Sequence, residues 1–169
     1  MKRLAIITTM ISLMLMQFPV KAEDYTTGIG LRLGGYTSGF TVKGFLNSRG
    51  ALEGIAGFGR RSFVMTGLYE HHFPITSAAG LSLYAGGGGH FGLFGHNSSY
   101  FVYRHKNESV YVIDEGNTAF IPGVDGVFGI EYKFQGAPFT VGADIKPFMD
   151  FYDGPTHYID GALNLRWVF

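Results

Sequence analysis

Apolar and polar residues alternate with a period of two along most of the chain after residue 23, and clusters of turn residues interrupt the alternation. This period is typical of β-strands that present one apolar and one polar face. No segment of useful length has apolar residues at helical spacing. The pattern predicts eight strands, which cover Thr26–Gly35, Gly39–Leu46, Ala51–Arg60, Ser62–Phe73, Gly80–Phe94, Gly123–Phe134, Phe139–Phe148 and His157–Phe169.

The two faces of the predicted strands differ in charge. In the last strand, Leu163 and Leu165 share one face, and Arg166 lies on the other. A soluble barrel turns its apolar face inward, whereas a barrel in a membrane turns it toward lipid. The charged face carries Arg32, Lys43, Glu53, Glu70, His90, Asp125, Glu131, Lys133, Asp144, Lys146, Asp160 and Arg166, and His72 is expected beside them.

The charged face is nearly balanced in sign, and this balance predicts where it points. A basic side chain facing lipid near the midplane costs about 2–4 kcal/mol, and an acidic one costs somewhat less. These residues are therefore expected to face the interior. The interior of an eight-stranded barrel is just wide enough to be filled by side chains. We predict a polar network of ion pairs that closes the lumen, and not an open pore.

The connections between the strands differ in length. Those at "NSRG", "PITSAAG" and "QGAP" are short, whereas the connection at residues 95–122 is long and polar. Short turns at one end and longer loops at the other are typical of barrels in the outer membrane. The fold prediction is an all-β, eight-stranded antiparallel up-and-down transmembrane β-barrel. Aromatic and β-branched residues in the long loop predict a hairpin, whose exposed edge is a candidate site for a surface protein partner.

The start of the chain has the features of an export signal. Met1-Lys2-Arg3 is basic, Leu4 to Val20 is mostly apolar, and a site that suits signal peptidase ends at Ala22. We predict a signal peptide at residues 1–22 and a barrel at residues 23–169. A membrane anchor is the alternative. Removal of the signal leaves ten of the 13 basic residues against all 13 acidic ones, a weak field that predicts no nucleic-acid partner.

The composition narrows the choice of barrel. The chain has 26 glycines, 16 phenylalanines and 10 tyrosines, but no cysteine. Glycine suits a narrow, strongly curved barrel, and disulfide stapling is ruled out. Aromatic residues recur near the predicted strand ends, as in the girdles of membrane barrels. A soluble, secreted, lipocalin-like barrel that binds a ligand remains an alternative, because it also alternates.

Three segments carry a resemblance to a known family: "LYEHHFPI", the glycine-rich "LYAGGGGHFGLF" and the terminal strand. The chain resembles the small outer-membrane barrels of outer-membrane protein X and of the transmembrane domain of outer-membrane protein A. The resemblance implies export through the periplasm to the outer membrane of a Gram-negative cell, with contact to membrane lipid and lipopolysaccharide. The resemblance also implies a terminal signal read by the barrel-assembly machinery, formed by Leu163, Leu165, Trp167 and Phe169. Because members of the family differ widely in role, the function is predicted from the exposed loop at residues 95–122: a monomer with a non-enzymatic role in envelope integrity, adhesion or surface recognition.

Two groups of residues suggest a chemical site instead. His96 and Ser98 resemble the His-x-Ser of outer-membrane lipid A deacylases, in which Ser98 would attack an ester, His96 would take its proton and Glu108 would orient the imidazole. Glu70 and His72 are candidate metal ligands, but His71 points to the opposite face of its strand. From these residues we predict no enzyme activity, no catalytic residue, no metal and no cofactor, with the deacylase as the alternative.

Overall fold

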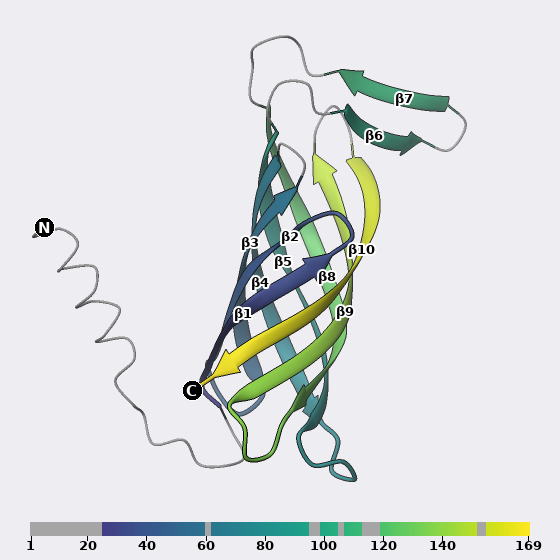
Figure 1. The fold of residues 1–169 in the computed structure, drawn as a ribbon. Helices are drawn as coiled ribbons and strands as arrows, with labels where there is room; N and C mark the ends of the chain where they lie inside the picture. Colours follow the sequence, from purple (N-terminus) through teal and green to yellow (C-terminus); the bar gives the residue numbers. More distant parts are fainter. Residues whose placement is uncertain (1–24, 60–61, 95–98, 105–106, 113–118, 152–154) are drawn as a thin grey trace, which may run out of the picture.

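A computed structural model describes residues 25–59, 62–94, 99–104, 107–112, 119–151 and 155–169. Eight of its strands close into an antiparallel barrel in the order β1-β10-β9-β8-β5-β4-β3-β2 (Figure 1). They are β1 (Thr27–Gly34), β2 (Ser38–Phe45), β3 (Gly50–Gly59), β4 (Ser62–Pro74), β5 (Leu81–Phe94), β8 (Ala119–Lys133), β9 (Phe139–Phe151) and β10 (Pro155–Val168). The predicted all-β, eight-stranded antiparallel barrel is confirmed.

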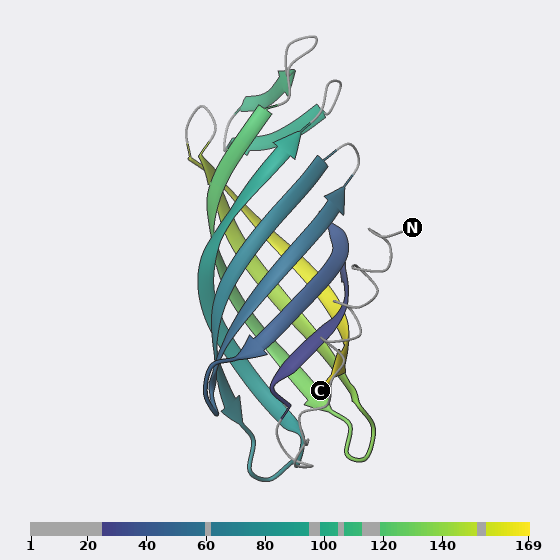
Figure 2. The ribbon, with the colours of Figure 1, turned by 90° about the vertical axis from the view of Figure 1, so that its left-hand side faces the viewer.

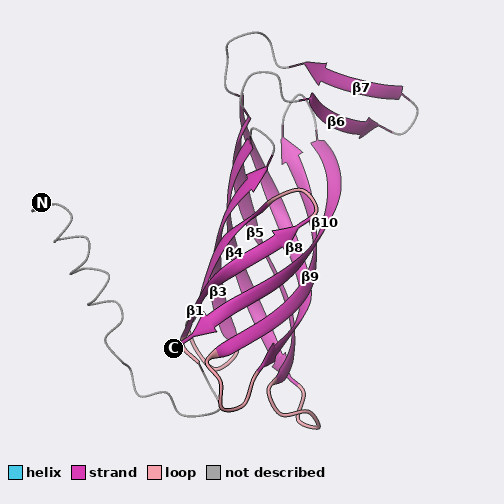
Figure 3. Ribbon diagram, in the orientation of Figure 1, coloured by secondary structure: helices cyan, strands magenta, loops and turns pink. Residues whose placement is uncertain are grey.

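The barrel closes because its first and last strands pair. Leu31 of β1 lies opposite Leu165 of β10, and the pairing runs from Gly28 with Val168 to Gly34 with Ala162. The strands wind around the barrel at a steep tilt (Figure 2). All described secondary structure is strand (Figure 3). In the part of the chain that the structure describes, no helix is long and apolar enough to cross a membrane.

The two ends of the barrel differ in their connections. The end at which β10 finishes, here called the lower end, has the short turns 46–49, 75–80 and 134–138. Gly80 and Gly136 in these turns have φ angles of 84° and 78°, a region that disfavours residues with a Cβ. The opposite, upper end carries the long connection between β5 and β8. This connection contains the hairpin of β6 (Ser99–Arg104) and β7 (Asn107–Val112), which projects beyond the barrel (Figure 1).

The strand limits differ most from the sequence prediction at the upper end. β8 begins at Ala119 and not at Gly123, and β9 continues to Phe151 and not only to Phe148. Pro122 had suggested a loop, but at this height β8 pairs only with β5, since its pairing with β9 starts at Gly123. Proline is tolerated on such a free edge, because its missing N–H takes no bond from the ladder. The wall of β5, β8, β9 and β10 is therefore much longer than β1 and β2.

Candidate functional site: the charged lumen

The barrel places its apolar residues outside and its charged residues inside. Leu31, Leu163 and Trp167 face outward, with 48%, 63% and 46% of their surface exposed. Arg32 and Arg166, which alternate with them, face the lumen and are 2% and 0% exposed. This arrangement is the reverse of that in a soluble lipocalin-like barrel, and it gives an exterior suited to hydrocarbon.

Aromatic rings gather in pairs on the outer surface toward both ends of the strands. Near the lower end, the rings of Phe139 and Trp167 meet edge to face with centroids 4.5 Å apart. Near the upper end, Phe91 and Phe120 stack at 5.9 Å. Such bands are typical of the membrane interface, where amphipathic rings bridge the apolar and polar layers. An unsupported aromatic surface of this kind would be a liability in water.

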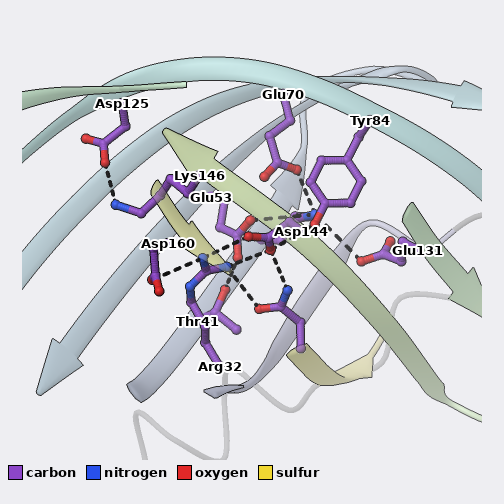
Figure 4. A network of polar contacts seen from close by, with 12 residues as sticks. Arg32, Thr41, Glu53, Glu70, Tyr84, Asp125, Glu131, Asp144, Lys146 and Asp160 are labelled. Atoms are coloured by element: carbon purple, nitrogen blue, oxygen red, sulfur yellow. Dashed lines mark hydrogen bonds and ion pairs between the residues drawn. The ribbon is translucent and has the colours of Figure 1, made fainter. Parts of the chain in front are cut away.

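The lower cluster of the lumen is built around Arg166 of β10. Its guanidinium contacts Glu53 of β3 and donates a hydrogen bond of 2.8 Å to Glu131 of β8. Thr41 of β2 also hydrogen-bonds to Glu53 and receives a 3.4 Å bond from Arg166 Nε. Arg166 and Thr41 are fully buried. These contacts tie four strands together across the lumen. Figure 4 shows Thr41 beside Glu53, with Glu131 on the far side of the network.

Lys43 is the second cation of the lower cluster. Its Nζ atom lies 2.7 Å from Glu70 and 3.6 Å from both Glu53 and Glu131. The same atom lies 4.3 Å from the centre of the Tyr84 ring, a cation–π contact. Lys43 Nζ has no hydrogen bond of good geometry, nor has Glu70 Oε1. At a separation of 2.7 Å, Lys43 and Glu70 nevertheless form an ion pair.

Two ring side chains, Tyr25 and His72, complete the lower cluster. Tyr25 donates a hydrogen bond from its hydroxyl to Glu131. His72 places Nε2 at 3.2 Å from Glu70, and its ring stacks on Tyr84 with centroids 5.2 Å apart. Glu70 and His72, the candidate metal ligands, have no third ligand beside them in the part of the chain that the structure describes. The described residues contain no group of three or more His, Cys, Asp or Glu that could hold a metal ion.

The middle of the lumen is held by Arg32 of β1 and Asp144 of β9. The guanidinium forms two parallel hydrogen bonds with the carboxylate, at 2.6 and 2.8 Å, which is the strong bidentate geometry. Asn164 and Tyr84 donate to the same carboxylate at 2.7 and 3.1 Å. Asp160 lies 3.8 Å from Arg32. Tyr84 thus connects the middle of the network to Lys43 below.

The upper cluster centres on His90 of β5. Its ring places Nδ1 at 2.7 Å from Asp125 and Nε2 at 2.8 Å from Asp150. Both carboxylates are satisfied when the ring carries both protons, since each nitrogen then acts as a donor. Lys146 pairs with the other oxygen of Asp125. Polar clusters therefore occupy the lumen at three heights, from Tyr25 near the lower end to Asp150 near the upper end.

The geometry of the network favours a structural role over chemistry. Nearly every charged group has an oppositely charged partner within hydrogen-bond distance, and the side chains are almost completely buried. A catalytic acid or base needs access to a substrate proton. In the described lumen, the acids and bases instead contact one another, so the arrangement links strands across the barrel.

The predicted lumen residues all lie on the inner face, with differences in detail. Arg32, Lys43, Glu53, Glu70, Asp125, Glu131, Asp144, Lys146, Asp160 and Arg166 are buried, and so is His72. His90 is bonded at both ring nitrogens. Lys133 is different: it is half-buried at the last position of β8, near the lower rim.

Sequence reasoning missed several members of the network. Asp150 lies beyond the predicted end of its strand, although it continues the alternation of Asp144 and Lys146. Tyr25 precedes the predicted first strand. Tyr84 shares the inner face with His90, but its aromatic ring gave no signal of a polar role. Thr41 and Asn164 follow the alternation and were recognisable only as polar-face residues.

The other predicted residues stand as follows. Leu163, Leu165 and Trp167 face outward, and Phe169 closes the last pairing through backbone bonds with Thr26 and Thr27. Whether they form an assembly signal stays a prediction. The signal peptide at residues 1–22 and the candidate catalytic residues His96 and Ser98 lie outside the described residues, and Glu108 is described only as part of β7.

Comparisons with known proteins place the fold. No protein-family model matches the sequence, and no curated protein matches it significantly. Among solved structures, the N-terminal β-barrel domain of OprF from Pseudomonas aeruginosa matches with a TM-score of 0.63 and 14% identity, over 86% of this chain and all of that domain. CarO2 from Acinetobacter baumannii covers the same shares with a TM-score of 0.40 and 10% identity, so the likeness rests on OprF. The chain therefore shares the fold of a small β-barrel of the kind that its sequence pattern resembles, and the expected resemblance is confirmed at the level of the fold.

Proposed function

We propose that the protein is a closed β-barrel of the outer membrane of a Gram-negative cell, with a non-enzymatic role in envelope integrity or in recognition at the cell surface. The observation that supports this most directly is the orientation of the strands. Outward Leu163 is 63% exposed, whereas its neighbour Asn164 is 3% exposed and bonded inside the lumen. Only a surrounding of hydrocarbon makes this orientation favourable, because exposed apolar side chains and buried ion pairs are both unfavourable in water.

The lumen network supports a closed barrel rather than a channel. Arg166, Lys43 and Arg32 each reach a carboxylate on another strand, so their side chains extend across the central section of the lumen. Eight-stranded barrels leave little space beyond that occupied by side chains. The protein is therefore proposed to act through its outer surfaces and not through transport of solutes.

The hairpin of β6 and β7 is the proposed recognition element. It lies beyond the upper end of the barrel as a separate two-stranded sheet, so each strand has only the other as a partner within that sheet. A strand with an unpaired edge can bind an extended segment of another protein by strand addition. We further propose contact with lipopolysaccharide at the upper end, insertion by the barrel-assembly machinery, and a monomeric barrel.

Fractionation tests the location. The exported protein should collect in the outer-membrane fraction and should migrate faster on a detergent gel before heating than after it, because a folded barrel stays compact in detergent. Recovery of a soluble protein from the periplasm would contradict the proposal.

Replacement of residues 99–112 by a short turn tests the role of the hairpin. In a strain that lacks the protein, the variant should restore resistance to detergents as well as the wild type does, but it should not restore surface adhesion. Full restoration of adhesion by the variant would show that recognition does not use the hairpin. If the deletion strain adheres as well as the wild-type strain, the recognition role is contradicted and only the envelope role is left.

A further inference from the structure

The wall between β8 and β9 has an interruption in its ladder of backbone hydrogen bonds. Asp125 pairs with Phe148, and Phe128 pairs with Ile145, but Gly126 and Val127 do not pair with Pro147 and Lys146. Pro147 has no N–H to donate. On its other side, Pro147 keeps its place opposite Ile159 of β10. The wall at Gly126 and Val127 therefore lacks the regular strand pairing of its surroundings. Backbone groups that face hydrocarbon without a hydrogen-bond partner are energetically costly.

A groove of about 820 Å³ lies at this interruption. From the outer face, it is lined by Val124, Met149 and Ile159, and from the inner face by Phe148 and Tyr158. Gly126 also borders the groove, and a Cβ there would lie 3.3 Å from Pro147 Cγ, so the proline ring packs closely against this glycine. The volume falls within the range of about 300–1,000 Å³ typical of pockets for small ligands. The groove thus combines a local break in the sheet with space for a ligand.

The lining of the groove indicates an apolar occupant. Val124 and Ile159 are 46% and 69% exposed, and they continue the apolar belt of the barrel into the groove. The inner-face rings of Phe148 and Tyr158 pack against each other and against Tyr36 of the β1–β2 connection, which is 57% exposed, with centroids 5.1 to 5.8 Å apart. This aromatic wall offers a broad contact surface to a hydrocarbon chain.

The charged groups behind the groove do not provide for a polar ligand. Asp125 lines the groove, but one of its oxygens contacts His90 and the other contacts Lys146. Lys146 is further occupied by the Phe148 ring, 4.8 Å from its Nζ. A charged headgroup that entered the groove would have to break these buried pairs, which is strongly unfavourable.

We propose that this groove binds a single acyl chain of a membrane lipid, with the polar headgroup left at the upper rim near Tyr36 and His157. The proposal rests on the proposed membrane location, because the apolar belt with which the groove is continuous is then the lipid interface. Since hydrocarbon surrounds the barrel on all sides, binding is driven by van der Waals contact with the recessed surface.

Native mass spectrometry tests the proposal. The protein is refolded in vesicles of phosphatidylethanolamine and phosphatidylglycerol and then transferred to detergent, and the lipids that remain bound are counted. The wild type should retain one lipid. Val124→Trp, which fills the groove from the outer face, should lose it. The matched control is Val141→Trp, an outward and 39% exposed position of β9 outside the groove, which should keep it.

Faster migration before heating shows which variants have folded, and Ile159→Trp serves as a second groove variant if Val124→Trp does not fold. Equal retention of lipid by wild type and folded groove variants would overturn the proposal, and so would a wild type that retains none. A barrel that folds in vesicles but retains no lipid after transfer to detergent would contradict only the proposed lipid site in the groove. A protein that does not enter vesicles contradicts the membrane location as well.

Discussion

Replacement of Arg166 by methionine removes one of the two cations of the lower cluster and keeps an unbranched side chain. Arg166 is fully buried and contacts Glu53 and Glu131. In the variant, Lys43 alone would face these two carboxylates and Glu70. Removal of one partner from a buried ion pair leaves an uncompensated charge, which costs about 3–5 kcal/mol. We expect the free energy of unfolding to fall by that amount.

Urea titration of the protein refolded in lipid vesicles measures this loss. The folded fraction is read from the migration of unheated samples, and the free energy of unfolding follows by linear extrapolation to zero urea. The double variant Arg166→Met with Glu53→Gln removes one carboxylate together with the cation. Because the two residues are in contact, we expect it to recover about 0.5–3 kcal/mol relative to the sum of the single variants.

Arg49→Met is the matched control, because Arg49 is exposed in a turn at the lower end. Its effect should stay within about 0.5 kcal/mol, as is usual for surface substitutions. An effect of Arg166→Met no larger than that of the control would refute the reasoning, since it would mean that water reaches Glu53 and Glu131 and that the lumen is not closed. Additive effects of Arg166→Met and Glu53→Gln would show that the two residues do not act as a pair.

Three further predictions concern the wall, the lumen and the alternative activity. Leu163→Arg places a cation on the lipid side and should lower the free energy of unfolding by about 2–4 kcal/mol, whereas Phe151→Arg near the upper rim should cost about 0–1 kcal/mol; similar values for both would contradict a membrane-spanning wall. Vesicles that contain the wild type should show little swelling in sugar solutions, and fast sugar entry would refute the closed lumen. Mass spectrometry of lipid A should give the same acyl content for cells with the wild type and with Ser98→Ala, and a difference would favour the deacylase.

The fold followed from the sequence because alternation depends only on the local environment of each strand. Arg32 between Leu31 and Leu33, and Arg166 between Leu165 and Trp167, define two faces without any knowledge of the neighbouring strands. The same local signal failed at the strand ends. Pro122 suggests a loop in any local interpretation, and only the uneven height of the neighbouring strands makes it part of β8.

The partners within the lumen could not be predicted, because they depend on how the barrel closes. Arg166 reaches Glu53 on β3 and Glu131 on β8, and neither strand is its neighbour in the wall. Which carboxylate meets which cation is set by the tilt of the strands and by their stagger around the barrel. Tyr84 shows the same limit: its place on the inner face was evident, but its contacts with Lys43 and Asp144 depend on the far wall.

The distribution of charge also explains how the strands find a unique register. Each of the eight barrel strands carries at least one ionisable side chain on its inner face. A slip of one residue exchanges the two faces of a strand. In β9, such a slip would move Lys146 into lipid, at about 2–4 kcal/mol near the midplane, and Ile145 into the charged lumen. Buried ion pairs add little net stability over a well-packed apolar interior, because desolvation offsets most of their attraction. We infer that these charges contribute chiefly by making register slips of an odd number of residues unfavourable, a discrimination that an apolar lumen would lack because lipid and lumen would then accept the same side chains.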